Sequence, residues 1–172
     1  NGRVLVDVDN LLFWVDTQKS IKNAKEAAEK YLGIEVDDVD LTYTIELKNT
    51  SIVGGPSAGA AFAVATVSTL QNKTIDSNTI ITGTIEEDGT IGKVGGIIAK
   101  GEAAKEGGYK KFLVPDGEKN LVENRRIKEC ENIGSVRICD IEYKSVDVDL
   151  EEELGIEVIE VKNLEEAIGH ML

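Results

Sequence analysis

Ser57 is the residue whose type and position first suggest chemistry. It lies in Gly54-Gly55-Pro56-Ser57-Ala58-Gly59, where the glycines and the proline predict a tight turn. The alanine-rich run that follows, up to Leu70, predicts a buried helix of about four turns. Free N–H groups and the positive end of the helix dipole favour negative charge at a helix start. A hydroxyl there suits acyl transfer, because the developing oxyanion would meet hydrogen-bond donors already in place.

A serine nucleophile needs a general base, and the sequence offers a lysine rather than a histidine. His170 is the only histidine and lies near the end of the predicted last helix, so a Ser-His-Asp triad is not expected. A lysine can take the proton when burial lowers its pKa and leaves a neutral amine. Lys100 stands between small and apolar neighbours that favour such burial, residues 95–99 and 101. From the residues alone, an N-cap serine and a lysine that extends into solvent remain the alternatives.

Length and charge limit the classes of function. With 172 residues, of which 41% are hydrophobic and 30% charged, the chain is expected to form one globular domain, residues 1–172. The 32 acidic and 19 basic residues give a net charge of -13, which argues against nucleic acid or an anionic membrane as partner. The sequence contains no apolar run of about 18 residues, which a membrane helix would need. The first residue is Asn1 rather than methionine, so the domain is expected to be a fragment of a longer chain.

The sequence offers few ligands for a metal ion. Cys130 and Cys139 are the only cysteines, and the chain has one histidine. A four-ligand zinc site is therefore not expected, and no metal or other cofactor is predicted. We expect the two cysteines to be independent thiols. A disulfide between them is the alternative.

Hydrophobic periodicity predicts strands that alternate with helices. The predicted strands are 41–47, 79–85, 90–94, 110–115, 136–139 and 157–161, with an N-terminal hairpin around Asp9-Asn10 and a second hairpin turn at 86–89. The predicted helices are 21–32 with Ser20 as cap and Gly33 as end, the helix after Ser57, 97–106, a polar helix from Asp116 to about Cys130, and 164–172 capped by Asn163. The acidic segment 147–153 is expected to be a solvated face. This order predicts an α/β (α+β) fold with mixed small sheets and packed helices.

Several motifs in a fixed order carry a family resemblance. They are Gly55-Pro56-Ser57-Ala58-Gly59, Thr82-Gly83-Thr84-Ile85, the glycine-rich stretch 89–96, and Lys100. Together they resemble the proteolytic domain of the Lon proteases, which are Ser-Lys dyad peptidases. The 43 residues from Ser57 to Lys100 match that family's spacing. The likeness continues through Ala103-Ala104, the strand end 113–115 and the segment 163–167, and covers residues 15 to 172 or so.

The resemblance implies a role for each matched residue. Ser57 corresponds to the nucleophile, and Lys100 to the general base that takes its proton. Thr82 matches a threonine that, in the family, lies close to the lysine amine and helps to aim it. The backbone N–H groups of Gly55 and Ser57 are the candidates for the oxyanion hole. The resemblance also implies that an extended polypeptide substrate pairs with a sheet edge beside the site.

The chain departs from the family at two positions before the serine. Many Lon proteases have an acidic residue three positions before it, where this chain has Gly54, and some have one directly before it, where this chain has Pro56. A P-loop, Gly-x-x-x-x-Gly-Lys-[Ser/Thr], does not occur in the 172 residues, so no ATPase domain is expected in this chain. The chain thus most resembles the ATPase-free archaeal Lon-like serine proteases.

This resemblance implies an ATP-independent serine endopeptidase that cleaves extended or unfolded polypeptides. By analogy it also implies a homo-oligomer, a hexamer in the family, and a membrane-anchored or extracytoplasmic location, with a cytoplasmic one as the alternative. Two other functions remain open. One is a non-catalytic Lon-fold module that binds peptides or mediates assembly, with Ser57 as a helix cap. The other is an acyl-transfer enzyme for small esters or amides.

Overall fold

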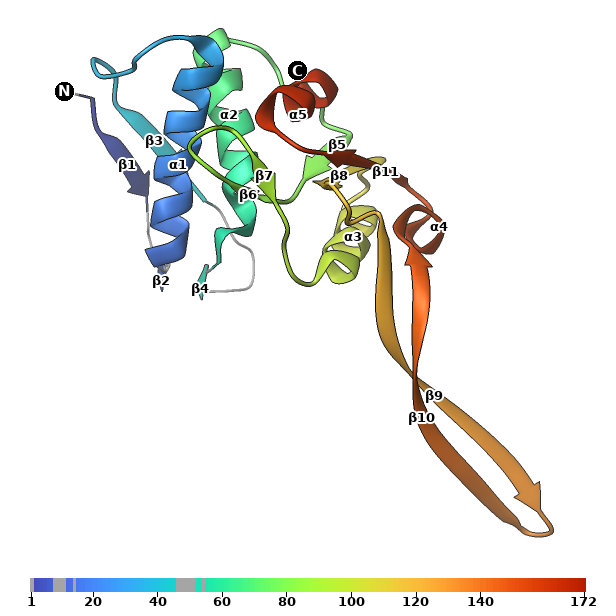
Figure 1. Cartoon of the computed structure of the whole chain (residues 1–172). Coiled ribbons are helices and arrows are strands. Elements are labelled where there is room, and N and C mark those ends of the chain that lie inside the picture. The colour runs from blue at the N-terminus through green and yellow to red at the C-terminus, as the bar shows by residue number, and fades with distance from the viewer. Residues whose placement is uncertain (1, 8–11, 14, 46–51, 54) are drawn as a thin grey trace.

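A three-stranded parallel sheet lies at the centre of the body of the molecule. The computed structural model describes residues 2–7, 12–13, 15–45, 52–53 and 55–172. The central strands are β5 (Thr79–Ile81), β8 (Lys111–Pro115) and β11 (Glu157–Val161), in the order β11–β8–β5. Figure 1 shows helices on both sides of this sheet and a long two-stranded ribbon that leaves the body.

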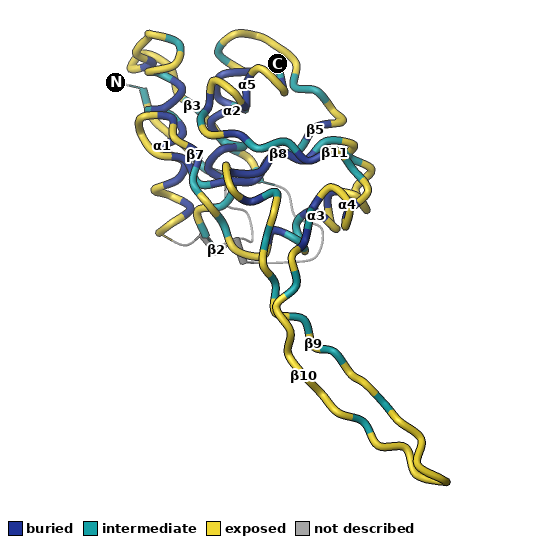
Figure 2. Tube along the Cα trace, turned by 45° about the vertical axis from the view of Figure 1, so that its right-hand side comes forward, coloured by how far each residue is buried: buried dark blue, intermediate teal, exposed yellow. Residues whose placement is uncertain are grey.

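Strand alternation distributes the central sheet's side chains between two hydrophobic cores. Leu113 and Val161 pack with the helices α1 (Val15–Leu32), α2 (Gly59–Gln71) and α5 (Leu164–Met171). Phe112 and Val114 point the other way and pack with α3 (Ile97–Glu106) and α4 (Leu150–Leu154). Successive side chains of a strand point to opposite faces, and a parallel sheet covered by helices is buried on both. Figure 2 shows that the buried residues lie in the body, among them those of β8 and β11.

Three smaller sheets complete the body. Strands β1 (Val4–Asp7) and β3 (Leu41–Thr44) are parallel, as are β2 (Leu12–Phe13) and β4 (Ile52–Val53). Strands β6 (Thr84–Ile85) and β7 (Ile91–Gly92) are antiparallel around the predicted turn at 86–89. The α/β class with small sheets and packed helices is confirmed, although each sheet among the described residues is wholly parallel or wholly antiparallel.

The predicted N-terminal hairpin is wrong in its pairing. Strand β1 pairs with β3, and β2 pairs with β4, so the two halves of the expected hairpin belong to different sheets. The turn residues Asp9-Asn10 lie outside the described residues. The first strand has an alternating pattern and the second a short apolar run, and neither pattern identifies the partner strand.

Helix α1 begins earlier than the sequence predicts. It starts at Val15, so Ser20 lies inside the helix, buried, rather than at its cap. The Ser20 hydroxyl donates to the carbonyl of Pro56 at 3.4 Å, and Thr17 donates to the carbonyl of Gly55 at 3.5 Å. The first turns of α1 therefore contact the serine turn through small polar side chains, which carry no apolar signal in the sequence.

The predicted polar helix from Asp116 to Cys130 is also wrong, because this segment forms most of a strand. Strand β9 (Asn120–Ile133) pairs with β10 (Val136–Asp149) along fourteen residues each, around a turn at Gly134-Ser135. Glutamate, lysine and arginine favour helices in isolation. Here pairing with β10, which contains several valine and isoleucine residues, outweighs that preference. Cys130 and Cys139 lie directly opposite each other and form a disulfide, so the expectation of two independent thiols is wrong.

Two further predictions concern the acidic segment 147–153, which is not a plain solvated face, and the cap of the last helix, which is confirmed. The segment forms the end of β10 and most of α4 rather than a plain solvated face, because Leu150 is fully buried. Asn163 caps α5 as predicted, since its side chain accepts the N–H of Glu166 at 2.9 Å.

Candidate active site

Ser57 lies in a short 3-10 helix that leads directly into α2. This helix, η1, spans Pro56–Ala58, and α2 begins at Gly59. Proline occupies the first helical position, where its missing N–H costs no hydrogen bond. Gly55 precedes it with φ 89° and ψ 153°, a conformation that favours glycine. The serine, half-buried, therefore stands at the start of a buried helix, as predicted.

The Thr82-Gly83 pair holds the serine turn in place. The Thr82 hydroxyl donates to the Ser57 carbonyl at 3.2 Å, and the Gly83 N–H donates to the same oxygen at 3.0 Å. The Gly83 carbonyl in turn accepts the N–H of Ala60 at 3.1 Å. These three bonds fix the backbone on both sides of the serine. In this structure Thr82 thus contacts Ser57, and its role towards the lysine amine stays a prediction.

Gly59 allows the start of α2 to approach β6 closely. A Cβ atom at this position would lie 2.8 Å from Cγ2 and 2.9 Å from the backbone nitrogen of Ile85. The second glycine of the serine motif therefore has a packing role.

Lys100 lies in the first turn of α3 and is half-buried. Burial lowers the pKa of Lys100 below the ordinary lysine value, and the negative charge of Glu118 acts against this by raising it. A lysine that acts as a base near neutral pH needs a lowered pKa, because only the uncharged amine can accept a proton.

Glu118 is the residue at this site that sequence reasoning missed. The residue is 6% exposed, and both carboxylate oxygens accept the Val94 N–H, at 3.4 and 3.3 Å. Val94 precedes the Gly95-Gly96 turn from which α3 begins. The sequence places Glu118 in a polar helix because of its type and its neighbours. The segment instead forms a turn, which buries the Glu118 carboxylate close to Lys100. Glu118 is therefore a candidate for setting the pKa of the candidate base.

The structure places the predicted site residues in two groups, and the second also contains Glu118, which was not predicted. Gly55, Ser57 and Thr82 form one, and Lys100 with Glu118 forms the other. Among the described residues, no hydrogen bond joins the Ser57 hydroxyl to the Lys100 amine, and the Lys100 pKa is set by burial and by Glu118. The oxyanion role of the Gly55 and Ser57 amides stays a prediction. His170 lies exposed on α5.

A cleft borders the serine turn. It has a volume of about 300 Å³ and is lined by α1, Pro56, and the strand β6 residues Thr84 and Ile85. Asn23 of α1 lines it too, and its amide donates to the Ile85 carbonyl at 2.9 Å while its buried Oδ1 has no hydrogen-bond partner. The cleft thus places a sheet strand beside Pro56, the residue next to Ser57.

The described part of the chain has neither a cluster of metal ligands nor a membrane-spanning helix. No three His, Cys, Asp or Glu side chains gather there in a way that could hold a metal ion. None of the helices in that part combines the length and the apolar character that crossing a membrane requires.

The comparison with known families agrees with the motifs. A model of the Lon protease (S16) C-terminal proteolytic domain matches residues 27–140. The chain belongs to this Lon proteolytic-domain family. Ser57, Thr82, Lys100 and Glu118 all lie inside the matched range.

Relatives of this Lon domain include archaeal proteins. The archaeal Lon protease of Methanothermobacter thermautotrophicus is 27% identical over 155 residues, 90% of this chain and 20% of that protein. The archaeal Lon protease of Archaeoglobus fulgidus is 28% identical over 156 residues, 90% of this chain and 21% of that protein. That of Methanocaldococcus jannaschii is 30% identical over 156 residues, 88% of this chain and 20% of that protein. The chain spans about a fifth of the length of these relatives.

Proposed function

We propose that this domain is an ATP-independent serine endopeptidase in which Ser57 is the nucleophile and Lys100 the general base. The observation that carries the proposal is the partial burial of Lys100, which lowers the pKa of its amine, in a chain of the Lon proteolytic-domain family. The position of Ser57 at the start of α2 supports it, because backbone N–H groups at a helix start stabilise negative charge.

The proposed reaction proceeds in two stages. In acylation, neutral Lys100 takes the Ser57 proton while Ser57 Oγ bonds to the scissile carbonyl carbon. The backbone N–H groups of Gly55 and Ser57 stabilise the tetrahedral oxyanion, and the protonated lysine then gives its proton to the leaving amine. In deacylation, water takes the place of the serine, Lys100 accepts its proton, and Ser57 leaves with a proton returned by the lysine. Each cycle leaves the enzyme unchanged and adds one water to the peptide bond.

The cleft beside Pro56 suggests how the substrate binds. Strand β6 pairs with β7, and an extended polypeptide in the cleft would lie along β6. Such binding reads the backbone more than the side chains, which fits unfolded polypeptides as the substrate class.

The disulfide supports an extracytoplasmic location for the proposed peptidase. Cys130 and Cys139 are paired, and disulfides persist mainly in oxidising compartments. Hydrolysis by the dyad needs no nucleotide, so such a compartment, where ATP is scarce, would suit it.

Covalent labelling tests the dyad. A fluorophosphonate probe should label the wild-type protein at Ser57, and Ser57→Ala should lose all labelling. Lys100→Ala should slow labelling by about 100-fold or more, because a general base contributes at least that factor. Two matched variants should keep the wild-type rate: Ser77→Ala, an exposed serine, and Lys105→Ala, an exposed lysine on the same helix as Lys100.

The same protein samples distinguish the alternatives. Cleavage of casein or of an unstructured peptide, lost in both dyad variants, supports the endopeptidase. Rapid hydrolysis of small esters without any peptide cleavage would indicate the small-molecule acyl-transfer enzyme. A folded protein that no fluorophosphonate or peptide boronate modifies would instead be the non-catalytic module.

A further inference from the structure

The β9–β10 ribbon carries different charges on its two faces. The pairing register places Glu123, Glu129 and Glu131 of β9 on the same face as Asp140 and Glu142 of β10, and we name this the acidic face. It places Arg126, Lys128 and Arg137 on the other side, which we name the basic face. Strand residues alternate between faces, so this separation follows from the register alone.

The contacts within the ribbon agree with these faces. On the acidic face, Arg125 pairs with Glu123 and Glu153, and Lys144 pairs with Glu129 and Glu142. The cations of this face are therefore already neutralised by neighbouring carboxylates, and an excess of negative charge remains.

The cations of the basic face have no such partners. Among the described residues, no carboxylate oxygen lies within 4.0 Å of the charged nitrogens of Arg126, Lys128 or Arg137. Tyr143, opposite Arg126, is 72% exposed, and Ile141, opposite Lys128, is 47% exposed. The Cys130–Cys139 disulfide lies on the same face, between Lys128 and Arg137. Asp147 and Asp149 lie on this face too, but at the end next to the body. The outer part thus combines free positive charge with apolar surface.

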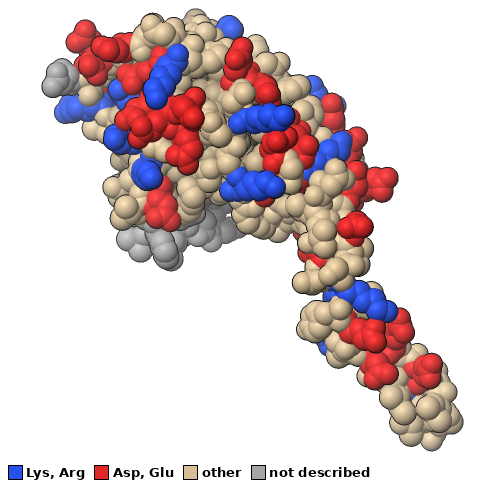
Figure 3. All heavy atoms as spheres, in the orientation of Figure 1, with Lys and Arg blue, Asp and Glu red and all other residues tan. Residues whose placement is uncertain are grey.

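The body of the molecule has the complementary charge. Of the chain's 19 basic and 32 acidic residues, five and seven lie in 120–149, which leaves 14 basic and 25 acidic residues for the rest. Figure 3 shows carboxylates at several places on the visible face of the body, with Lys and Arg side chains between them.

The ribbon cannot reach its own body. Figures 1 and 2 both show it leaving the body and pointing away from it. Each strand has 14 residues, which at the usual rise of a strand is a length of about 45 Å. The complementary surface in reach is therefore that of another molecule.

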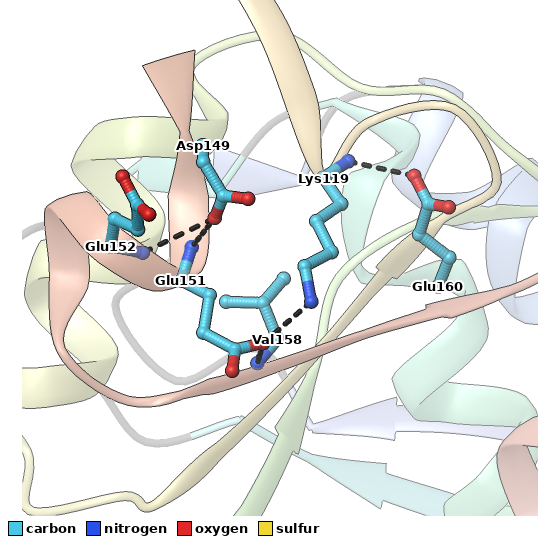
Figure 4. Close-up of polar contacts among 6 residues, drawn as sticks. All are labelled: Lys119, Asp149, Glu151, Glu152, Val158 and Glu160. Atoms are coloured by element: carbon cyan, nitrogen blue, oxygen red, sulfur yellow. Dashed lines mark hydrogen bonds and ion pairs between the residues drawn. The ribbon is translucent and has the colours of Figure 1, made fainter.

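The direction of the ribbon is fixed at its base. Lys119, just before β9, donates its backbone N–H to Glu160 at 2.8 Å and its amine to Glu151 at 2.5 Å (Figure 4). Asp149, the last residue of β10, accepts the N–H groups of Glu151 and Glu152 and so caps α4. This ion pair and cap tie both strands to the body, so the ribbon's position costs little to fix on binding.

We propose that the basic face of the ribbon docks onto the acidic body of a second copy of this chain. One face of a two-stranded ribbon of this length offers about 400 Å², whereas a stable interface needs about 800 Å² on each partner. In a closed, symmetric assembly every copy presents one ribbon and receives another, which raises the area that each copy buries to about 800 Å² over its contacts.

Sedimentation velocity tests the assembly. The wild-type chain should form a closed oligomer, and Arg126→Glu/Arg137→Glu should shift it to monomer at the same protein concentration. The control Lys73→Glu/Lys110→Glu makes the same charge change at exposed sites on the body and should leave the oligomer intact. Added salt should weaken the wild-type association, because exposed charges are screened. Circular dichroism would establish that all variants are folded.

Isotope-labelled crosslinking identifies the surfaces. A carbodiimide should join Lys128 to body carboxylates, and a mixture of ¹⁴N and ¹⁵N protein should show that these links join two different copies. A wild-type monomer at every concentration would overturn the proposal. So would an oligomer that both variants retain, or a monomer whose ribbon binds an unfolded polypeptide instead. None of these outcomes depends on peptidase activity.

Discussion

Two opposing effects act on the pKa of the Lys100 amine. Burial lowers its pKa, and the nearby negative charge of Glu118 raises it. Only the neutral amine can take the Ser57 proton, so the fraction of active enzyme grows as pH rises through the lowered pKa. We expect the rate of fluorophosphonate labelling to rise with pH and to level off below the pH at which an ordinary lysine titrates. A rate that stays flat between mildly acidic and alkaline pH would contradict Lys100 as base.

Glu118→Gln should make the enzyme more active at low pH. The substitution removes the charge that raises the Lys100 pKa, so the amine loses its proton at a lower pH. An amide oxygen can still accept the Val94 N–H, which preserves the turn. The rising part of the labelling profile should therefore move to lower pH, whereas Asp116→Asn, an exposed carboxylate two residues away, should leave it unchanged. A shift to higher pH in Glu118→Gln would show that the carboxylate acts on Lys100 in another way.

Some of these residues are predictable from sequence and others are not. Ser57 and Lys100 can be selected because a motif and its spacing are local features of the chain. Glu118 cannot, because its burial depends on the turn between β8 and the ribbon, which the sequence alone presents as part of a helix. The contact of Ser20 with Pro56 is likewise a tertiary one, between residues 36 positions apart.

Among the elements, α2 depends on its glycine start. Gly59→Ala would place a Cβ atom 2.8 Å from Ile85 Cγ2 and 2.9 Å from the Ile85 backbone nitrogen, and a strand backbone cannot easily move. We expect a loss of about 1–3 kcal/mol of unfolding free energy, the usual cost of an overpacked core. Labelling should slow as well, because the same helix carries the serine turn.

Gly95→Ala is the matched control for that substitution. A Cβ atom at Gly95 would meet no other heavy atom within 4 Å, and the backbone φ there is not positive. Alanine should therefore change the unfolding free energy by less than about 1 kcal/mol. Chemical denaturation of both variants compares the two. Equal stability of Gly59→Ala and the wild type would mean that α2 can withdraw from β6 without cost.

Elements with a buried periodic pattern are the predictable ones. Helix α3 spans 97–106 as predicted, and β8 and β11 lie within one residue of their predicted ranges, because apolar residues and flanking glycines or a proline define them locally. Strands β9 and β10 are not predictable in this way, since their stability comes from each other and few of their side chains enter a core.

The molecule as a whole consists of a packed body and a ribbon that contributes little to its core. An isolated two-stranded hairpin is only marginally stable in water. The ribbon is stabilised at its base by α4 and Lys119, and towards its tip by the disulfide. The cross-link closes a loop of 131–138, so its loss should loosen the tip far more than the body.

Hydrogen exchange can test this division. In Cys130→Ser/Cys139→Ser, amides of 127–141 should exchange about tenfold faster or more, because the cross-link no longer restricts opening of the tip. Amides of β5, β8 and β11 should keep their protection, since their side chains pack in the two cores that the tip does not enter. Adding a reductant should reproduce the effect in the wild type and do nothing in the double variant. Faster exchange throughout the central sheet would instead show that ribbon and body unfold as one cooperative unit.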